Sequence, residues 1–217
     1  MPHLVLLGDS IFDNARYTSG GSAVESQVRK LLPSKWNLTL LAVDGSTTDD
    51  IPGQMPLLPN DATHVVLSIG GNDALTYASR LGFSLFGIPD TPDSNTLDSL
   101  AGIYEDFERQ YRAVVDICLR PGLPLVLCTI YNGCFPDKAY QRLVPPALAV
   151  FTDVILRVAI AQGLRVIDLR SACKEAADYA NPIEPSSIGG EKIAQLIVAS
   201  VTRPDDQRHG TRIFARP

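Results

Sequence analysis

Residues 4–12 read LVLLGDSIF: four apolar residues followed at once by glycine, aspartate and serine. A short apolar run without polar alternation is typical of a strand buried on both faces of a parallel sheet. Four further runs of this kind follow, at residues 38–43, 64–69, 125–130 and 165–169. The sequence therefore predicts a five-stranded parallel sheet.

Helical patterns separate these runs. Residues 97–119 place apolar side chains at alternating steps of three and four, which forms one stripe along a helix. Residues 147–162 repeat the pattern ahead of Gly163, a typical C-terminal cap, and residues 189–202 carry the last helix. Alternating strands and helices predict an α/β fold, a three-layer α/β/α sandwich over residues 1–203, with 204–217 as a C-terminal tail.

Composition limits the possible partners. The 217 residues suffice for one domain, and 45% hydrophobic with 20% charged residues is ordinary for a globular protein. A net charge of −5 argues against nucleic acid or an anionic membrane as partner. Neither a signal-peptide core nor an apolar run of ~18 residues is evident. We expect a cytoplasmic protein without a membrane span, and the sequence leaves its oligomeric state open.

Cysteines and histidines are few. The four cysteines lack CxxC spacing, and Cys134, in a loop, has no histidine near it in sequence to activate it. Of the three histidines, His3 and His64 open the first and third strands, far from the strand C-termini, and are interpreted as structural. No cluster has metal-ligand spacing, so we expect no metal and no cofactor.

The segment at residues 80–96 mixes apolar residues with glycine and proline without any period. Two interpretations are open: a lid over a substrate site, or a surface loop.

Three consecutive strand ends carry the residues that suggest chemistry. Ser10 follows the first strand, Gly45 the second and Asn72 the third. Ligands of parallel sheets bind beyond the carboxyl ends of the strands, so these residues are expected to converge. The Ser10 N–H, the Gly45 N–H and the Asn72 amide would then surround a developing oxyanion. The alternatives are a helix cap at Ser10 and three unrelated turns.

In order and spacing, LVLLGDSIF, AVDGSTT and LSIGGNDAL resemble the conserved blocks of the SGNH (GDSL) esterase and lipase superfamily. The resemblance implies a flavodoxin-like fold and hydrolysis of small-molecule carboxylic esters, as in lipases, esterases or deacetylases. It also implies Ser10 as the nucleophile that carries the acyl group, with Gly45 and Asn72 completing the oxyanion hole.

The fourth block departs from that family. The family has an aspartate and, three residues later, a histidine; here these positions hold Asn181 and Glu184. Pro185 and Gly189 align with the family's proline and glycine, which supports the register. Glu184 is then the candidate base, with Asn181 as possible support. The alternative for Glu184 is a capping or surface carboxylate ahead of the last helix.

A glutamate with its ordinary pKa of ~4.3 is a weak base for a serine hydroxyl. Asp9, Asp13 and Asp73 are expected nearby, and like charges with partial burial would raise the pKa of Glu184. His209, in the tail, is the less favoured base.

Two other functions compete with the hydrolase. A non-catalytic protein on the same scaffold would use the oxyanion pocket to bind an acyl or small polar ligand. A nucleotide-binding domain is disfavoured because neither GxGxxG nor a P-loop follows a strand.

Overall fold

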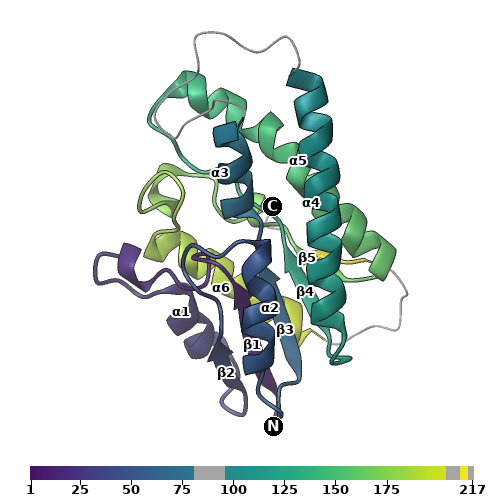
Figure 1. Ribbon diagram of the computed structural model, residues 1–217. Helices are drawn as coiled ribbons and strands as arrows, with labels where there is room; N and C mark the ends of the chain where they lie inside the picture. The colour runs from purple at the N-terminus through teal and green to yellow at the C-terminus, as the bar shows by residue number, and fades with distance from the viewer. Residues whose placement is uncertain (81–95, 204–210, 215–217) are drawn as a thin grey trace.

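The computed structural model describes residues 1–80, 96–203 and 211–214. In these ranges one parallel sheet runs through the molecule in the order β2-β1-β3-β4-β5-β6 (Figure 1). The strands are β1 (His3–Gly8), β2 (Asn37–Leu40), β3 (His64–Ser68), β4 (Leu125–Cys128), β5 (Arg165–Ile167) and β6 (Ile213–Phe214). The α/β prediction is confirmed.

Helices cover both faces of the sheet. They are α1 (Val24–Leu31), α2 (Ile51–Gln54), α3 (Gly71–Arg80), α4 (Thr96–Leu119), α5 (Lys138–Gln162) and α6 (Ser187–Thr202). Helices α1 and α6 pack side by side on one face, and α4 packs along α5 on the other (Figure 1). This is the three-layer sandwich that the sequence predicts.

Strand β1 explains why the apolar runs lack polar alternation. Its successive side chains point to opposite faces of the sheet. Val5 and Leu7 belong to the core under α4 and α5, whereas Leu4 and Leu6 belong to the core under α1 and α6. All four are fully buried, so both faces require apolar residues.

The sheet of the described residues has six strands, which corrects the prediction of five. The sixth strand, β6, comes from the tail that the sequence analysis separated at residue 203. Backbone bonds from the Val166 N–H to the Arg212 carbonyl (2.7 Å) and from the Asp168 N–H to the Phe214 carbonyl (2.8 Å) join it to β5. A two-residue strand is too short to leave a periodic signal.

Helix α5 begins nine residues earlier than predicted and continues through Pro145 and Pro146. With 25 residues and an 18-residue stretch of mean hydropathy 1.9, it is the one helix of the described ranges that could cross a membrane by length and composition. Its C-terminal half is buried in the core, at Phe151, Ile155 and Val158. Core helices of globular proteins pass the same test, so this feature is weak evidence for a span.

Two predicted features lie outside the described residues. Most of the 80–96 segment falls there, apart from its first and last residues, which belong to α3 and α4. His209 also falls there.

The attachment of β6 can be tested with two neighbouring residues. Phe214 is buried beside the α6 core, whereas Ile213 is 57% exposed. Phe214→Ala should lower the free energy of unfolding by about 3 kcal/mol because it empties a packed site. Ile213→Ala, on the same strand, should change it by less than about 1 kcal/mol. Urea unfolding measures both, and equal losses would contradict this packing.

Candidate active site

Ser10 lies just beyond the carboxyl end of β1. The strand order reverses at this point, because β2 lies on one side of β1 and β3 on the other. In open parallel sheets ligands bind in the crevice at such a switch point. Ser10 is 7% exposed and lines a cavity there.

Gly8 fixes the direction in which the chain leaves β1. Its φ is +128°, and a Cβ on it would lie 1.8 Å from the Ser68 carbonyl oxygen at the end of β3. The next residue, Asp9, donates its N–H to that same oxygen (3.1 Å). The buried Gln54 amide accepts from the Gly8 N–H (2.9 Å) and donates to the Gly8 carbonyl (2.8 Å). Only glycine fits this close approach of two backbones.

Glu184 contacts Ser10 directly. The Ser10 Oγ donates a hydrogen bond of 2.9 Å to the Glu184 Oε1, across 174 residues of sequence. Glu184 is 5% exposed, so it is not a surface carboxylate. Nor does it cap α6, because the Ser186 hydroxyl accepts from the first N–H groups of that helix. The structure thus brings together the serine and the carboxylate that the sequence aligned.

A turn ahead of α6 holds Glu184 in place. The Asn181 Oδ1 accepts from the N–H groups of Ile183 and Glu184, both at 3.0 Å. The Asn14 amide donates to the Pro185 carbonyl at 3.1 Å and thereby ties the turn to the segment after β1. Asn181 therefore orders the backbone of the turn.

Burial dominates the electrostatics of Glu184. It raises the pKa of this carboxyl to about 7, although the Ser10 hydrogen bond opposes the shift. The negative charge of Asp44 raises the pKa further, and Arg16, which is bonded to Asp44 at 2.9 Å, lowers it. The second oxygen, Glu184 Oε2, is buried and has no hydrogen-bond partner among the described residues.

Two other carboxyls lie close by. Burial raises the pKa of Asp9 to about 8, against the hydrogen bond from the Ile11 N–H, with smaller increases from the charges of Glu184 and Asp73. Burial also raises the pKa of Asp73, which accepts from the Thr48 hydroxyl at 2.6 Å. Asp73 thereby joins the start of α3 to the loop after β2.

Gly45 lies in the loop after β2, and the Asn72 side chain bonds to the same loop. Gly45 has a φ of +84°, and the Asn72 Nδ2 donates to the carbonyl of the following residue, Ser46, at 2.8 Å. This bond uses one of the two amide hydrogens of Asn72. The backbone N–H groups of Ser10 and Gly45 make no hydrogen bond to any described residue. Asn72 lines the same cavity as Ser10, whereas Gly45 lies outside its lining.

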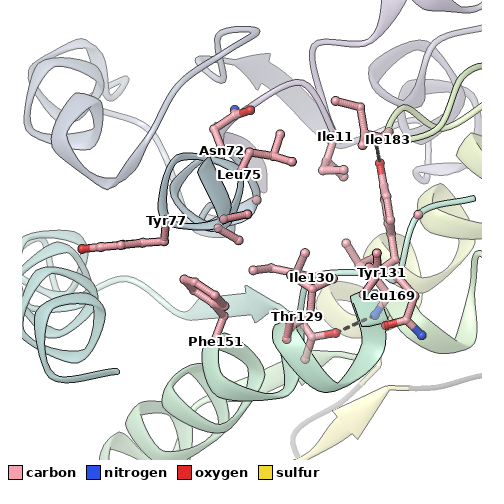
Figure 2. Close-up of a pocket in the computed structure, with 18 of the residues that line it drawn as sticks. Ile11, Asn72, Leu75, Tyr77, Thr129, Ile130, Tyr131, Phe151, Leu169 and Ile183 are labelled. Atoms are coloured by element: carbon pink, nitrogen blue, oxygen red, sulfur yellow. Dashed lines mark hydrogen bonds between the residues drawn. The ribbon is translucent and has the colours of Figure 1, made fainter. Parts of the chain in front are cut away.

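The cavity has a volume of about 310 Å³. Its polar residues include Asp9, Ser10, Asn72 and Glu184, and most of the other lining residues are apolar. Figure 2 shows Ile11 and Ile183, the neighbours of Ser10 and Glu184, across the cavity from Tyr77 and Phe151.

Sequence reasoning did not single out Gln54 and Asn14. Both are buried amides that bond to backbone groups, and a single glutamine or asparagine in a helix or loop gives no sequence signal of that role. His3 and His64 stand at the opposite ends of their strands, as expected, and His3 bonds to Asp61 at 2.9 Å. Among the described residues, no group of three or more histidines, cysteines or acidic residues could hold a metal ion.

Comparisons with known proteins identify the family and similar folds. The GDSL-like lipase/acylhydrolase family model matches residues 6–188. The fold is similar to an extracellular lipase from Streptomyces rimosus (TM-score 0.66, 18% identity, 93% of this chain and 100% of the other). It is also similar to a phospholipase A1 from Streptomyces albidoflavus (TM-score 0.64, 15% identity, 92% of this chain and 99% of the other). A variant of an acetyl xylan esterase from Geobacillus stearothermophilus scores 0.58, at 18% identity over 92% and 94% of the two chains.

The search of curated proteins returned no match by sequence. The family match covers most of the chain and includes the segments that carry Ser10, Asn72 and Glu184. This protein belongs to the GDSL-like lipase/acylhydrolase family.

Proposed function

We propose that this protein hydrolyses carboxylic esters through an acyl-Ser10 intermediate, with Glu184 in the place of the usual histidine base. The observation that carries the proposal is the 2.9 Å hydrogen bond from the Ser10 hydroxyl to the buried Glu184 carboxylate. A nucleophile bonded to a base at the end of a cavity is the arrangement that covalent catalysis requires.

In the first half-reaction the Ser10 Oγ attacks the ester carbonyl carbon while its proton moves to the Glu184 Oε1. The carbonyl oxygen becomes an oxyanion, for which the Ser10 N–H, the Gly45 N–H and the free amide hydrogen of Asn72 are the donors. The intermediate then collapses to acyl-Ser10. Protonated Glu184 returns the proton to the departing alkoxide, which leaves as an alcohol.

In the second half-reaction water attacks the acyl-Ser10 carbonyl. Glu184 accepts the water proton and passes it to the Ser10 Oγ as the acid leaves. The buried, unpartnered Glu184 Oε2 is an acceptor suited to that water. A buried oxygen without a hydrogen-bond partner costs free energy and calls for an explanation. The attacking water would supply the missing hydrogen bond to the Glu184 Oε2 during this half-reaction.

The pKa of the base supports this assignment. A general base works best when its pKa lies near the working pH, and burial brings Glu184 to about 7. His209 was the other candidate, but it lies outside the described residues, whereas Glu184 touches Ser10.

The similar structures support the reaction class. The lipase, the phospholipase A1 and the acetyl xylan esterase all carry names of ester hydrolases. Their names indicate different ester substrates, so we infer for this protein only the hydrolysis of an ester bond.

The first test removes the nucleophile and one oxyanion donor. Ser10→Ala should abolish hydrolysis of p-nitrophenyl esters, and Asn72→Ala should lower kcat by roughly 10²–10³ with little change in KM. The unfolding midpoint of each variant controls for loss of fold. A folded Asn72→Ala variant with unchanged kcat would remove Asn72 from the mechanism. If wild type and Ser10→Ala are equally inert on every ester tried, the non-catalytic binding protein becomes the better interpretation.

The second test concerns the base. Glu184 must be ionised to accept a proton, so kcat/KM should be low at pH 5, rise through about pH 7 and level off above pH 8. Glu184→Gln keeps the shape but cannot accept a proton, and it should be nearly inactive at every pH. Glu191→Gln, an exposed glutamate on α6, is the matched control and should retain the wild-type profile. Wild-type activity in Glu184→Gln would exclude Glu184 as the base.

The third test restores the residues that the family usually has. Glu184→His alone should recover little activity, because Asn181 carries no charge to stabilise an imidazolium. Glu184→His combined with Asn181→Asp should be at least tenfold more active than Glu184→His alone. A pH–rate profile of both variants measures the gain, and equal activity would show that residue 181 plays no electrostatic part.

A further inference from the structure

The part of the cavity beyond the catalytic groups is built from three helices and the end of β4. Leu75 and Tyr77 come from α3, Ile103 from α4, and Leu148 and Phe151 from α5. Figure 2 shows Tyr77 and Phe151 on the side of the cavity away from Ile11, and Leu75 between Asn72 and Ile11. A ligand that extends from Ser10 into this region meets alkyl and aromatic surface.

Three hydroxyl groups in the wall are already used by the protein. The Tyr131 hydroxyl donates to the Ile183 carbonyl, and the Thr129 hydroxyl donates to Asp168 (2.9 Å). The Tyr77 hydroxyl donates to the Gln110 amide oxygen at 3.4 Å. A polar ligand group placed against these side chains would lose its bonds to water and find few replacements.

We infer that this cavity binds the acyl chain of the substrate, and that the enzyme prefers linear acyl groups of about eight to ten carbons. The inference rests on the proposed ester hydrolysis and names its substrate class. Ser10 and Glu184 line the same cavity as these apolar side chains. A chain esterified to Ser10 therefore extends into it.

The volume sets the chain length. A cavity of about 310 Å³ is twice the ~150 Å³ of an apolar cavity that binds one benzene molecule. It therefore holds roughly 12 carbon-sized atoms, and the ester group at Ser10 takes some of them. An acetyl group leaves most of the cavity unfilled.

Two of the lining side chains, Tyr77 and Phe151, belong to a cluster of packed aromatic rings. The rings of Tyr77 and Phe151 lie with centroids 6.0 Å apart, and the ring of Phe107 packs edge-on against Phe151 at 4.8 Å. All three are buried. A sixteen-carbon chain exceeds the roughly 12 atoms that the cavity holds, so the preference should peak and then fall.

The experiment is a series of p-nitrophenyl esters from acetate to palmitate. Each methylene buried in an apolar pocket raises kcat/KM by up to about fourfold, so octanoate should exceed butyrate by on the order of 10². The series should peak at octanoate or decanoate and decline at palmitate. A maximum at acetate or butyrate, or a flat series, would overturn the inference.

Two alanines on α5 provide a matched pair. Ala147 lines the cavity and Ala149 does not, and both are exposed on the same helix. Ala147→Phe should lower the ratio of decanoate to acetate kcat/KM at least tenfold, and Ala149→Phe should leave it unchanged. Ala78→Phe, which changes a cavity-lining residue of α3, should repeat the loss if the Ala147→Phe ring turns to solvent. No change in this ratio for either cavity variant would overturn the inference.

A binding measurement separates this inference from the proposed reaction. Ser10→Ala should bind decanoate at least 10²-fold more tightly than acetate by calorimetry, and Ala147→Phe in that background should remove the difference. If no ester is hydrolysed but decanoate binds in this way, the acyl site stands and the hydrolase proposal fails. If esters are hydrolysed but decanoate and acetate bind alike, the reaction stands and the acyl site fails.

Discussion

The backbone of Gly8 runs against the Ser68 carbonyl where β1 and β3 end, and the position of the nucleophile depends on this approach. A side chain at residue 8 would overlap that carbonyl. The Gln54 amide holds both backbone groups of Gly8, and the Asp9 N–H bonds to Ser68. Ser10 therefore emerges at the switch point of the sheet with little freedom, as a preorganised nucleophile requires.

The candidate base follows a different design from a histidine triad. When a neutral histidine takes the serine proton it becomes a cation, and an aspartate stabilises it. A glutamate that takes the same proton becomes neutral, while the negative charge moves to the oxyanion. No new cation forms, so the site needs no aspartate at residue 181. The Asn181 side chain is free to order the turn by accepting two backbone N–H groups.

The sequence was sufficient for most of the fold because apolar runs and three-four periodicity are local signals. Strand β6 was missed because two residues cannot show a period, and its partner strand ends 46 residues earlier. The first nine residues of α5 were missed because prolines such as Pro145 and Pro146 usually interrupt helices. Both prolines are exposed, and the helix continues through them.

The part of the candidate site that depends on the spacing of sequence motifs was predictable. Pro185 and Gly189 set the register that aligned Glu184, and the contact with Ser10 agrees with that alignment. The amides of Gln54 and Asn14 were not predictable, because their bonds go to backbone groups from distant segments. Nor does sequence give the pKa of Glu184, which depends on how completely the folded chain excludes water from it.

The two buried carboxyls also link folding to proton uptake. In the unfolded chain Asp9 and Glu184 return to pKa values near 3.8 and 4.5, whereas the folded values are about 8 and about 7. The folded state therefore holds protons that the unfolded state releases, so the stability they contribute is complete below about pH 4. It is lost progressively from about pH 4 up to about pH 7 for Glu184 and about pH 8 for Asp9, at up to about 1.4 kcal/mol per pH unit for each group, and no further loss follows above those values. At the pH where catalysis requires an ionised Glu184, these two carboxyls therefore contribute least to the free energy of unfolding.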